Sequence, residues 1–222
     1  MAHCVIMRDM SPANPASNLR ETKKHRTRGR IIDAVLRLGT DDGLEATTIA
    51  AIAAEADIGP RTFFRFFPTK EAAVVAPEEE LFRNLLDALG DVGPTELLGT
   101  AFSRAFDIAL GRLDTSWRHR FRGAAQLLES SPSANAAAMV LCARTREQLH
   151  AILRDSLQEA PQHVIELALE GVLSAWRLAR RDWIAEGSTD PARLHALIRR
   201  NMQTLEERPL AELTFSGGAT GS

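Results

Sequence analysis

Residues 48–71 read TIAAIAAEADIGPRTFFRFFPTKE, and the interpretation of the whole chain starts from this stretch. Thr48 is a good N-cap for a short helix over residues 49–55, because its hydroxyl can accept a hydrogen bond from a backbone amide of the first turn. Pro60 marks the start of a second short helix, since proline at the first helical position has no amide that needs a partner. The spacing therefore predicts two short helices joined by a tight turn.

The turn, residues 56–59, has the length found in a helix-turn-helix, whose second helix enters the major groove of DNA. Such a turn needs one residue near the left-handed conformation, and Asp57 tolerates that region better than most non-glycine residues. A helix that begins at Pro60 directs Arg61 and Thr62 toward nucleic acid. Arg61 can make the bidentate contact with guanine that is the commonest direct readout of a base.

The charge of the chain is divided unevenly along its length. The formal net charge is only −2, but residues 1–70 carry 11 Lys and Arg against 8 Asp and Glu, whereas residues 71–222 carry 16 against 21. Residues 20–30 hold six basic side chains and one acid, a run that alone would indicate a solvated face. Next to a helix-turn-helix, it favours contact with DNA phosphates, which carries no sequence information. The residues expected at these phosphates are Lys23, Lys24 and Arg28.

The segment from Arg28 to Glu71 resembles the DNA-binding domain of TetR-family transcriptional regulators. This resemblance implies a homodimeric, all-helical repressor whose larger C-terminal domain binds a small effector. The residues that carry it are Thr47-Thr48-Ile49, Ile52-Ala53, Ala56-Asp57-Ile58 and the closing run TFFRFFPTKE, residues 62–71. Carried over position by position, the resemblance assigns phosphate contacts to Thr48 and Lys70, a backbone contact to Arg65, and places at or near the bases to Pro60, Arg61, Thr62 and Phe64.

Two positions depart from the family's pattern. Phe64 stands where the family usually has tyrosine, so the hydroxyl is missing, although apolar contact with a thymine methyl group remains available. Gly39 stands at the end of the first helix, in a place commonly filled by phenylalanine. We expect Phe63, Phe66 and Phe67 to fill that space and to belong to the core, whereas for Phe64 a core role and a DNA contact both stay open.

The remainder of the chain also reads as helical, which makes the fold class all-α. Alanine, leucine, arginine and glutamate dominate, and no alternating run of β-branched residues reaches strand length. Asn18 and Glu21 resemble a capping box that begins a helix near residue 19. Capping residues and prolines predict later helices over residues 70–89, 94–112, 115–129, 132–158, 161–186 and 190–207.

These boundaries divide the chain into four expected parts. Residues 1–17 are expected to be a disordered arm and residues 209–222 a disordered tail. Residues 18–68 form the helix-turn-helix domain. Residues 69–208 form a larger helical domain for effector binding and dimerisation.

Several classes of protein have no support in the sequence. Cys4 and Cys142 are too few for a disulfide framework or a multi-thiolate zinc site, which favours a reducing cytosol. The six histidines are dispersed, and H-E-x-x-H, G-x-S-x-G and glycine-rich phosphate loops are absent. Residues 1–18 lack the apolar core of a signal peptide, and the longest uncharged run, residues 130–143, is too short to cross a bilayer. We therefore predict a cytoplasmic protein without enzymatic activity, metal, cofactor or membrane contact.

The helices expected between residues 94 and 158 are candidates for an effector pocket. Trp117 and Phe121 recur at helical spacing, so a core role competes with a pocket role for such aromatic residues. Arg118 and Arg122 lie one turn apart and can either hold an anionic ligand or form a solvated face. The region is weakly similar to TetR members of the mycofactocin-regulator type, which implies a lipophilic or anionic effector such as an acyl-CoA. The candidate pocket residues are Phe102, Phe106, Trp117, Phe121, Arg122 and Met139.

The last two expected helices carry apolar seams that suggest a dimer. A pair of such helices cannot bury both seams alone, so a second copy can complete a four-helix interface, as the resemblance also implies. Some of the seam must instead face its own domain, and the spacing does not separate the two alternatives. The residues expected at the dimer interface are Leu169, Val172, Trp176, Trp183, Leu194, Ile198 and Leu205.

These expectations describe a ligand-responsive DNA-binding regulator, most simply a repressor that releases a near-palindromic double-stranded operator when a small effector binds. A dimer would place its two recognition helices one DNA turn apart, ~34–36 Å. An activator or dual regulator has the same sequence signature, and an architectural protein would bind DNA without sequence preference. An enzyme with an accessory DNA-binding part would need a catalytic set that the C-terminal part does not offer.

Overall fold

The computed structural model describes residues 15–90, 97–156 and 160–207, and within these ranges every regular element is a helix, so the all-α expectation is confirmed. The expected tail and residues 1–14 of the expected arm lie outside the described residues. The helices are α1 (Pro15–Asp41), α2 (Ile49–Glu55), α3 (Pro60–Phe66), α4 (Lys70–Val74), α5 (Ala76–Leu89), α6 (Leu98–Gly111), α7 (Thr115–Ser130), α8 (Pro132–Ser156), α9 (Gln162–Ala185) and α10 (Pro191–Glu207).

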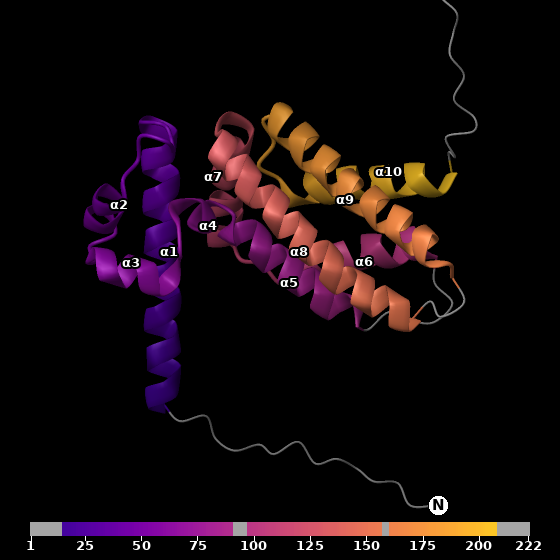
Figure 1. The fold of residues 1–222 in the computed structure, drawn as a ribbon, viewed down its shortest axis with the longest axis horizontal. Coiled ribbons are helices and arrows are strands. Elements are labelled where there is room, and N and C mark those ends of the chain that lie inside the picture. The colour runs from indigo at the N-terminus through magenta and orange to yellow at the C-terminus, as the bar shows by residue number, and fades with distance from the viewer. Residues whose placement is uncertain (1–14, 91–96, 157–159, 208–222) are drawn as a thin grey trace, which may run out of the picture.

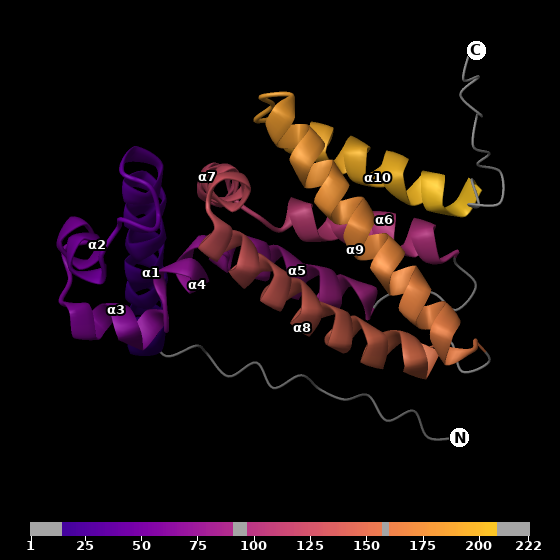
Figure 2. The ribbon, with the colours of Figure 1, turned by 45° about the horizontal axis from the view of Figure 1, so that its top comes forward.

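The helices form two parts, which we call the head (α1–α3) and the body (α5–α10) (Figures 1 and 2). In the head, α2 and α3 pack on the side of α1 that faces away from the body. The short helix α4 connects head and body, and α1 also contacts α7 directly.

The head has its own buried core around the phenylalanines that follow Pro60. Phe63 is fully buried and Phe67 nearly so, with their ring centroids 6.2 Å apart, and Phe66 is half-buried. The core role expected for these three residues agrees with this burial. They do not fill the space beside Gly39, however. A Cβ atom at Gly39 would lie 3.0 Å from Leu127 Cδ1 and 3.5 Å from Leu44 Cδ1, so leucines of α7 and of the loop after α1 occupy that place.

Three predicted helix boundaries are wrong. Helix α1 begins at Pro15, so Asn18 lies within the helix and cannot be its N-cap. Residues 15–17, expected to be disordered, are helical, and proline is well suited to a first turn because it lacks an amide. Residue 97, expected to be helical, is extended and caps α6. The single helix expected over residues 70–89 is divided into α4 and α5.

The break between α4 and α5 lies at Val75 and has a local cause. The amide of Val75 still donates to the carbonyl of Glu71 at 3.0 Å, which closes α4. Pro77 follows two residues later, and its ring has no amide for a helical hydrogen bond and clashes with the carbonyl four residues before it. Helix α5 therefore starts anew, with proline in its first turn.

The body is built around Trp176 of α9. Its indole stacks on Phe106 at 5.5 Å between ring centroids and meets Phe82 edge-on at 5.7 Å. The indole nitrogen donates to Glu78 Oε1 at 2.6 Å, and Arg180 Nη1 donates to the same carboxylate at 2.8 and 3.0 Å. Glu78 and Arg180 are both buried, and their ion pair compensates the charge of each side chain, which would otherwise be costly to bury. This network fixes the start of α5 to α9.

Candidate nucleic-acid interface

Helix α3 presents one face to solvent and the other to the core of the head. Phe63 lies on the core face, and Thr62 is half-buried beside it. Phe64 is 56% exposed although it is a large apolar side chain, and its ring meets Phe63 edge-on at 5.6 Å. The exposed face of α3 consists of Pro60, Arg61, Phe64 and Arg65.

The turn before α3 has the conformation that its sequence predicts. Asp57 has φ of 51°, and it is the one non-glycine residue with positive φ in the described part of the chain. Thr48 caps α2, because its hydroxyl accepts a hydrogen bond from the amide of Ala51 at 3.2 Å. Arg37 of α1 donates to Glu55 at 2.9 Å and so holds the end of α2 against α1. The helix-turn-helix geometry is therefore confirmed, while the phosphate contact of Thr48 stays a prediction.

Lys70, expected at a DNA phosphate, is used inside the protein. Its ammonium group donates to the carbonyls of Leu44, Glu45 and Thr47 at 2.6, 3.1 and 2.9 Å. An ammonium group has three donors, so none remains for a phosphate in this arrangement. Lys70 thus clamps the loop between α1 and α2 onto the start of α4.

The basic side chains of α1 separate into exposed and engaged groups. Lys23 and Lys24 are exposed and available to a polyanion. Arg28 lies 3.7 Å from Glu79 of α5 and stacks over the Phe67 ring at 4.8 Å, and burial lowers the pKa of its guanidinium group. The structure therefore gives Arg28 a place between head and body, not on an open DNA-facing surface.

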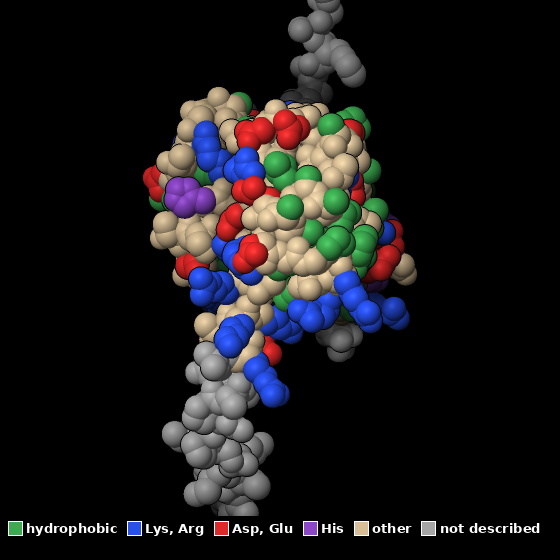
Figure 3. All heavy atoms as spheres, turned by 90° about the vertical axis from the view of Figure 1, so that its left-hand side faces the viewer, with side chains coloured by type: hydrophobic (Ala, Val, Ile, Leu, Met, Phe, Trp, Pro, Cys, Tyr) green, Lys and Arg blue, Asp and Glu red, His purple; other side chains and the backbone are tan. Residues whose placement is uncertain are grey.

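Figure 3 shows the head from the side on which α2 and α3 lie. Lys and Arg side chains gather across the lower part of this face, and most acidic side chains lie above them. The field of such a face attracts a polyanion even though the whole chain is slightly acidic. The basic character expected for the head is therefore visible on this face.

The expected effector-pocket residues do not form one site. Phe102, Phe106 and Phe121 are fully buried within the body core. Arg122 donates to the carbonyl of Ser188 and lies over the Trp183 ring at 5.8 Å, which gives it a structural role. The Met139 prediction is wrong, because the opposite face of α8 packs inward and leaves Met139 53% exposed. Trp117 is buried, and its indole nitrogen donates to the carbonyl of Pro77 at 2.9 Å.

Six of the seven expected dimer residues are buried inside their own protomer. The seam at 3.5-residue spacing on α9 faces the body core, with Trp176 at its centre. Only Leu205 is exposed. The six corrected residues are Leu169, Val172, Trp176, Trp183, Leu194 and Ile198.

Helix α9 carries a second, outward stripe that the sequence reading missed. Val164, Leu167 and Leu178 are exposed, with Gly171 and Ser174 between them, and these positions repeat with spacings of three and four residues. The helical spacing of these positions could have indicated the stripe. It is less apolar than the buried seam, however, because two of its members, Gly171 and Ser174, are small or polar. Beside it runs an apolar groove of about 590 Å³ that is bounded by Leu97, Leu98 and residues of α9 and α10.

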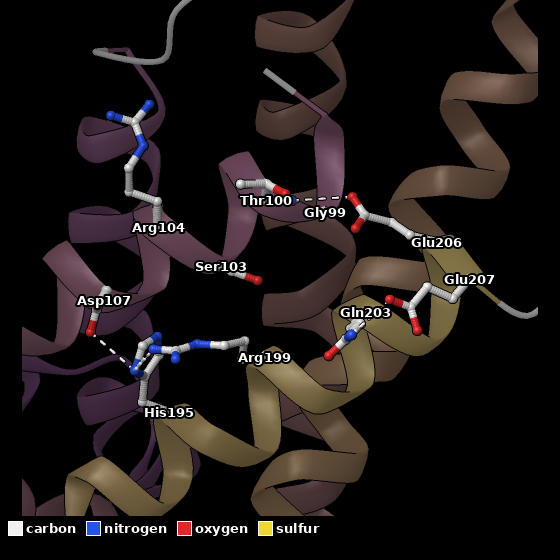
Figure 4. A pocket seen from close by; sticks show the side chains of 10 residues that line it. All are labelled: Gly99, Thr100, Ser103, Arg104, Asp107, His195, Arg199, Gln203, Glu206 and Glu207. Atoms are coloured by element: carbon white, nitrogen blue, oxygen red, sulfur yellow. Dashed lines mark hydrogen bonds and ion pairs between the residues drawn. The ribbon is translucent and has the colours of Figure 1, made fainter.

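A polar groove of about 440 Å³ lies between α6 and α10 (Figure 4). His195 Nδ1 lies 3.1 Å from Asp107 Oδ1, and Glu206 Oε1 accepts a hydrogen bond from the amide of Thr100 at 3.2 Å. Charged groups of both signs line this groove and in part pair with one another, so it has no strong preference for one sign of ligand charge.

Two other kinds of site receive no support within residues 15–90, 97–156 and 160–207. His, Cys, Asp and Glu side chains do not converge there in a group of three or more that could hold a metal ion. None of the helices in these ranges combines the length and the apolar character needed to cross a membrane.

Comparison with known proteins shows that the amino-terminal part of the chain is similar to one family. Residues 31–76 match the family model described as "Bacterial regulatory proteins, tetR family". The HTH-type transcriptional regulator TcmR of Streptomyces glaucescens is 40% identical over 96 residues, which are 43% of this chain and 42% of TcmR. The chain thus matches less than half the length of this curated relative.

Solved structures extend the similarity of fold to most of the chain. The fatty acid degradation regulator FadR from Bacillus halodurans matches with a TM-score of 0.52 and 16% identity, over 82% of this chain and 95% of FadR. A putative tetR family transcription regulator from Shewanella sp. PV-4 matches with a TM-score of 0.50 and 21% identity, over 81% and 95% of the two chains. At such identities the likeness concerns the fold alone.

Proposed function

Because residues 31–76 match the family model of tetR-type bacterial regulatory proteins, we propose that the chain is a TetR-family regulator: a homodimeric, DNA-binding transcriptional regulator of the cytoplasm. It acts as a repressor, and a small effector bound by the body releases it from a near-palindromic operator. The effector is a lipophilic or anionic molecule, with acyl-CoA-like compounds as one class.

The observation that carries the proposal is the exposed face of α3. Arg61 and Phe64 project from it without a partner among the described residues except the edge of Phe63. Burial of a phenylalanine side chain is favourable in free energy, and an exposed phenylalanine lacks this gain. The exposed position of Phe64 therefore favours a partner that covers it. A thymine methyl group gives such a contact, and Arg61 beside it reaches a guanine edge.

Phosphate contacts surround this reading face in the proposed complex. Arg65 at the end of α3, together with Lys23 and Lys24 on α1, supplies positive charge on exposed positions. These contacts fix the position of the head on the duplex and add affinity for any sequence. Lys70 is not included, because its donors hold the loop between α1 and α2.

The second copy in the proposed dimer packs on the outward stripe of α9. Leu167 and Leu178 are exposed there, and between them the half-exposed Leu205 side chain of α10 lies against Gly171, so the apolar surface extends from α9 onto α10. Isologous packing of this stripe joins two bodies and leaves both heads free. The two α3 helices then read half-sites one DNA turn apart, ~34–36 Å.

Effector response requires a mechanical connection between body and head, and two contacts supply it. Arg120 of α7 forms a bidentate pair with Asp33 of α1, at 2.7 and 2.9 Å. Glu45, in the loop after α1, accepts a hydrogen bond from Ser131 at 2.7 Å. A ligand that prefers an arrangement of α7 incompatible with DNA binding shifts the population toward the released state, with a coupling free energy of ~1–3 kcal/mol.

The proposal is tested with a duplex selected from random DNA by the purified protein. We expect Arg61→Ala to weaken binding to the selected duplex by ~1–3 kcal/mol and to leave affinity for a scrambled duplex nearly unchanged. Arg154→Ala, which removes an equal charge from an exposed position at the end of α8, should change neither affinity. Equal losses for Arg61→Ala on both duplexes would remove the direct readout, and equal affinity of the wild type for all duplexes would indicate an architectural protein.

A further inference from the structure

A cleft of about 350 Å³ lies between head and body, and its lining includes five basic side chains and two acidic ones. One wall is the middle of α1, and the other is formed by the start of α5, the turn between α6 and α7, and the first turns of α7. His25, Arg26 and Arg28 come from α1, whereas Arg112 and Arg120 come from the body. The acidic side chains that line it are Glu80 and Asp114.

Four arginines line the cleft against two carboxylates, so the side chains that line it carry a positive formal charge. Asp114 is occupied as the N-cap of α7, where it accepts hydrogen bonds from the amide of Trp117 at 2.7 Å and from the hydroxyl of Ser116 at 2.8 Å. Arg120 is paired with Asp33, and Arg28 lies near Glu79. Arg26 and Arg112 form no ion pair with a described residue, although they stand on opposite walls of one cleft.

Arg120 lies in this cleft close to Gly29 of α1. A Cβ atom at Gly29 would lie 2.6 Å from Arg120 Nη2, so the guanidinium group lies against the backbone of α1. In that position it reaches both oxygens of Asp33. The cleft therefore combines one fixed guanidinium group with two unpaired ones.

We propose that this cleft binds a small anion that carries a phosphate group, such as a phosphate ester. A phosphate dianion offers three acceptor oxygens, and planar guanidinium groups are the side chains best matched to them. Bound between Arg26 on α1 and Arg112 on the body, it bridges the two parts and competes with Asp33 for Arg120. The binding itself does not depend on the function proposed above; only its regulatory consequence, a changed orientation of the head, rests on that function.

The test uses pyrophosphate as the probe and the full chain without DNA. Isothermal titration at constant ionic strength should show one site per chain in the wild type. The double variant Arg26→Gln/Arg112→Gln should bind at least about tenfold more weakly, since it loses two charge-assisted contacts. The matched control, Arg144→Gln/Arg154→Gln on exposed positions of α8, should bind like the wild type. Thermal unfolding of both variants checks that their folds are intact.

Three outcomes of these measurements decide whether the cleft binds a phosphate-bearing anion. Equal affinity of the two double variants for pyrophosphate overturns the site. The absence of pyrophosphate binding to the wild type, together with weaker binding of the Arg26→Gln/Arg112→Gln variant to every duplex, assigns these arginines to the DNA backbone and also overturns it. Pyrophosphate binding that is lost only in this variant supports the site, even if the protein binds no duplex, in which case the proposed function alone fails.

Discussion

At the scale of single residues, the ammonium group of Lys70 connects two elements that are distant in sequence. Its three hydrogen bonds end on carbonyls of the loop between α1 and α2. We expect Lys70→Ala to lower the free energy of unfolding by about 1–3 kcal/mol, because three carbonyls lose a charged donor. Urea unfolding in the absence of DNA measures this loss. Lys24→Ala, at an exposed position of α1, should leave stability nearly unchanged.

The alternative for Lys70 has a distinct signature. The TetR resemblance assigns it a phosphate contact, which affects binding and not folding. If Lys70→Ala unfolds at the same urea concentration as the wild type but binds all duplexes more weakly, the phosphate contact is correct and the clamp is unimportant.

Cys142 illustrates a residue whose environment decides its chemistry. Burial raises the pKa of its thiol to about 11, so the reactive thiolate is scarce at neutral pH. In a Cys4→Ser background, we expect an aromatic disulfide reagent to modify folded Cys142 very slowly at pH 7.5 and to modify it completely in urea. Absorbance of the released thiol follows both reactions. Rapid modification of the folded protein would contradict an inert packing role for this buried thiol.

Single residues were predictable where backbone chemistry alone decides the outcome. Asp57 and Thr48 take the turn and cap positions that their side chains favour, and Pro60 begins α3. The surroundings of Lys70 and Met139 were not predictable, because they come from segments far away in sequence. The carbonyls that bind Lys70 precede it by more than 20 residues, and no local pattern indicates them.

At the scale of elements, the start of α7 depends on its N-cap. Asp114 accepts a hydrogen bond from the amide of Trp117, and this bond lowers the pKa of its carboxyl group below the ordinary value of 3.8. We expect Asp114→Ala to lower the free energy of unfolding by ~1 kcal/mol at pH 7. The stabilisation from a depressed pKa is complete above the unfolded pKa and is lost as pH falls through the folded pKa, so the difference should shrink as pH falls below about 4. Unfolding curves at pH 7 and pH 3 measure it.

Asp114→Asn is the matched control for this cap. Asparagine keeps an acceptor for the Trp117 amide but carries no charge. Its deficit relative to the wild type should therefore be smaller than that of Asp114→Ala. Because both variants lack the titrating carboxyl group, both deficits should change by the same amount between pH 7 and pH 3. An Asp114→Ala deficit that is the same at pH 7 and pH 3 would show that the carboxylate charge contributes nothing.

The sequence predicts that these elements are helices, but it does not predict which face of a helix is buried in the core and which is exposed. Helix α9 has two apolar stripes, and the sequence reading selected the stronger one, which contains Trp176, as a dimer surface. The stronger stripe packs into the core of the body. The sequence could not show this, because a seam in a core and a seam in a dimer interface have the same helical periodicity. Only the packing of α5, α6 and α7 against α9 separates the two.

At the scale of the whole molecule, the loop between α1 and α2 is held from two directions. Lys70 binds its carbonyls from α4, and the Glu45 side chain accepts a hydrogen bond from Ser131 at the junction of α7 and α8. The side-chain hydrogen bond from Ser131 lowers the pKa of Glu45, so this link is made by the carboxylate. A shift of α7 relative to α4 therefore reaches the loop that leads into the helix-turn-helix. This arrangement connects the acidic body to the basic head without a long linker.

The outward stripe of α9 gives the prediction that concerns the complete assembly. We expect Leu167→Glu to dissociate the proposed dimer, because two copies would bring carboxylates together in an apolar interface with no partner for their charge. Sedimentation velocity should show a monomer for Leu167→Glu and a dimer for the wild type. Met139→Glu, an equal change at an exposed position of α8, should remain dimeric. On a selected duplex with two half-sites, Leu167→Glu should bind weakly and without cooperativity, since each head then reads its half-site alone. A Leu167→Glu variant that stays dimeric would move the interface away from this face of α9.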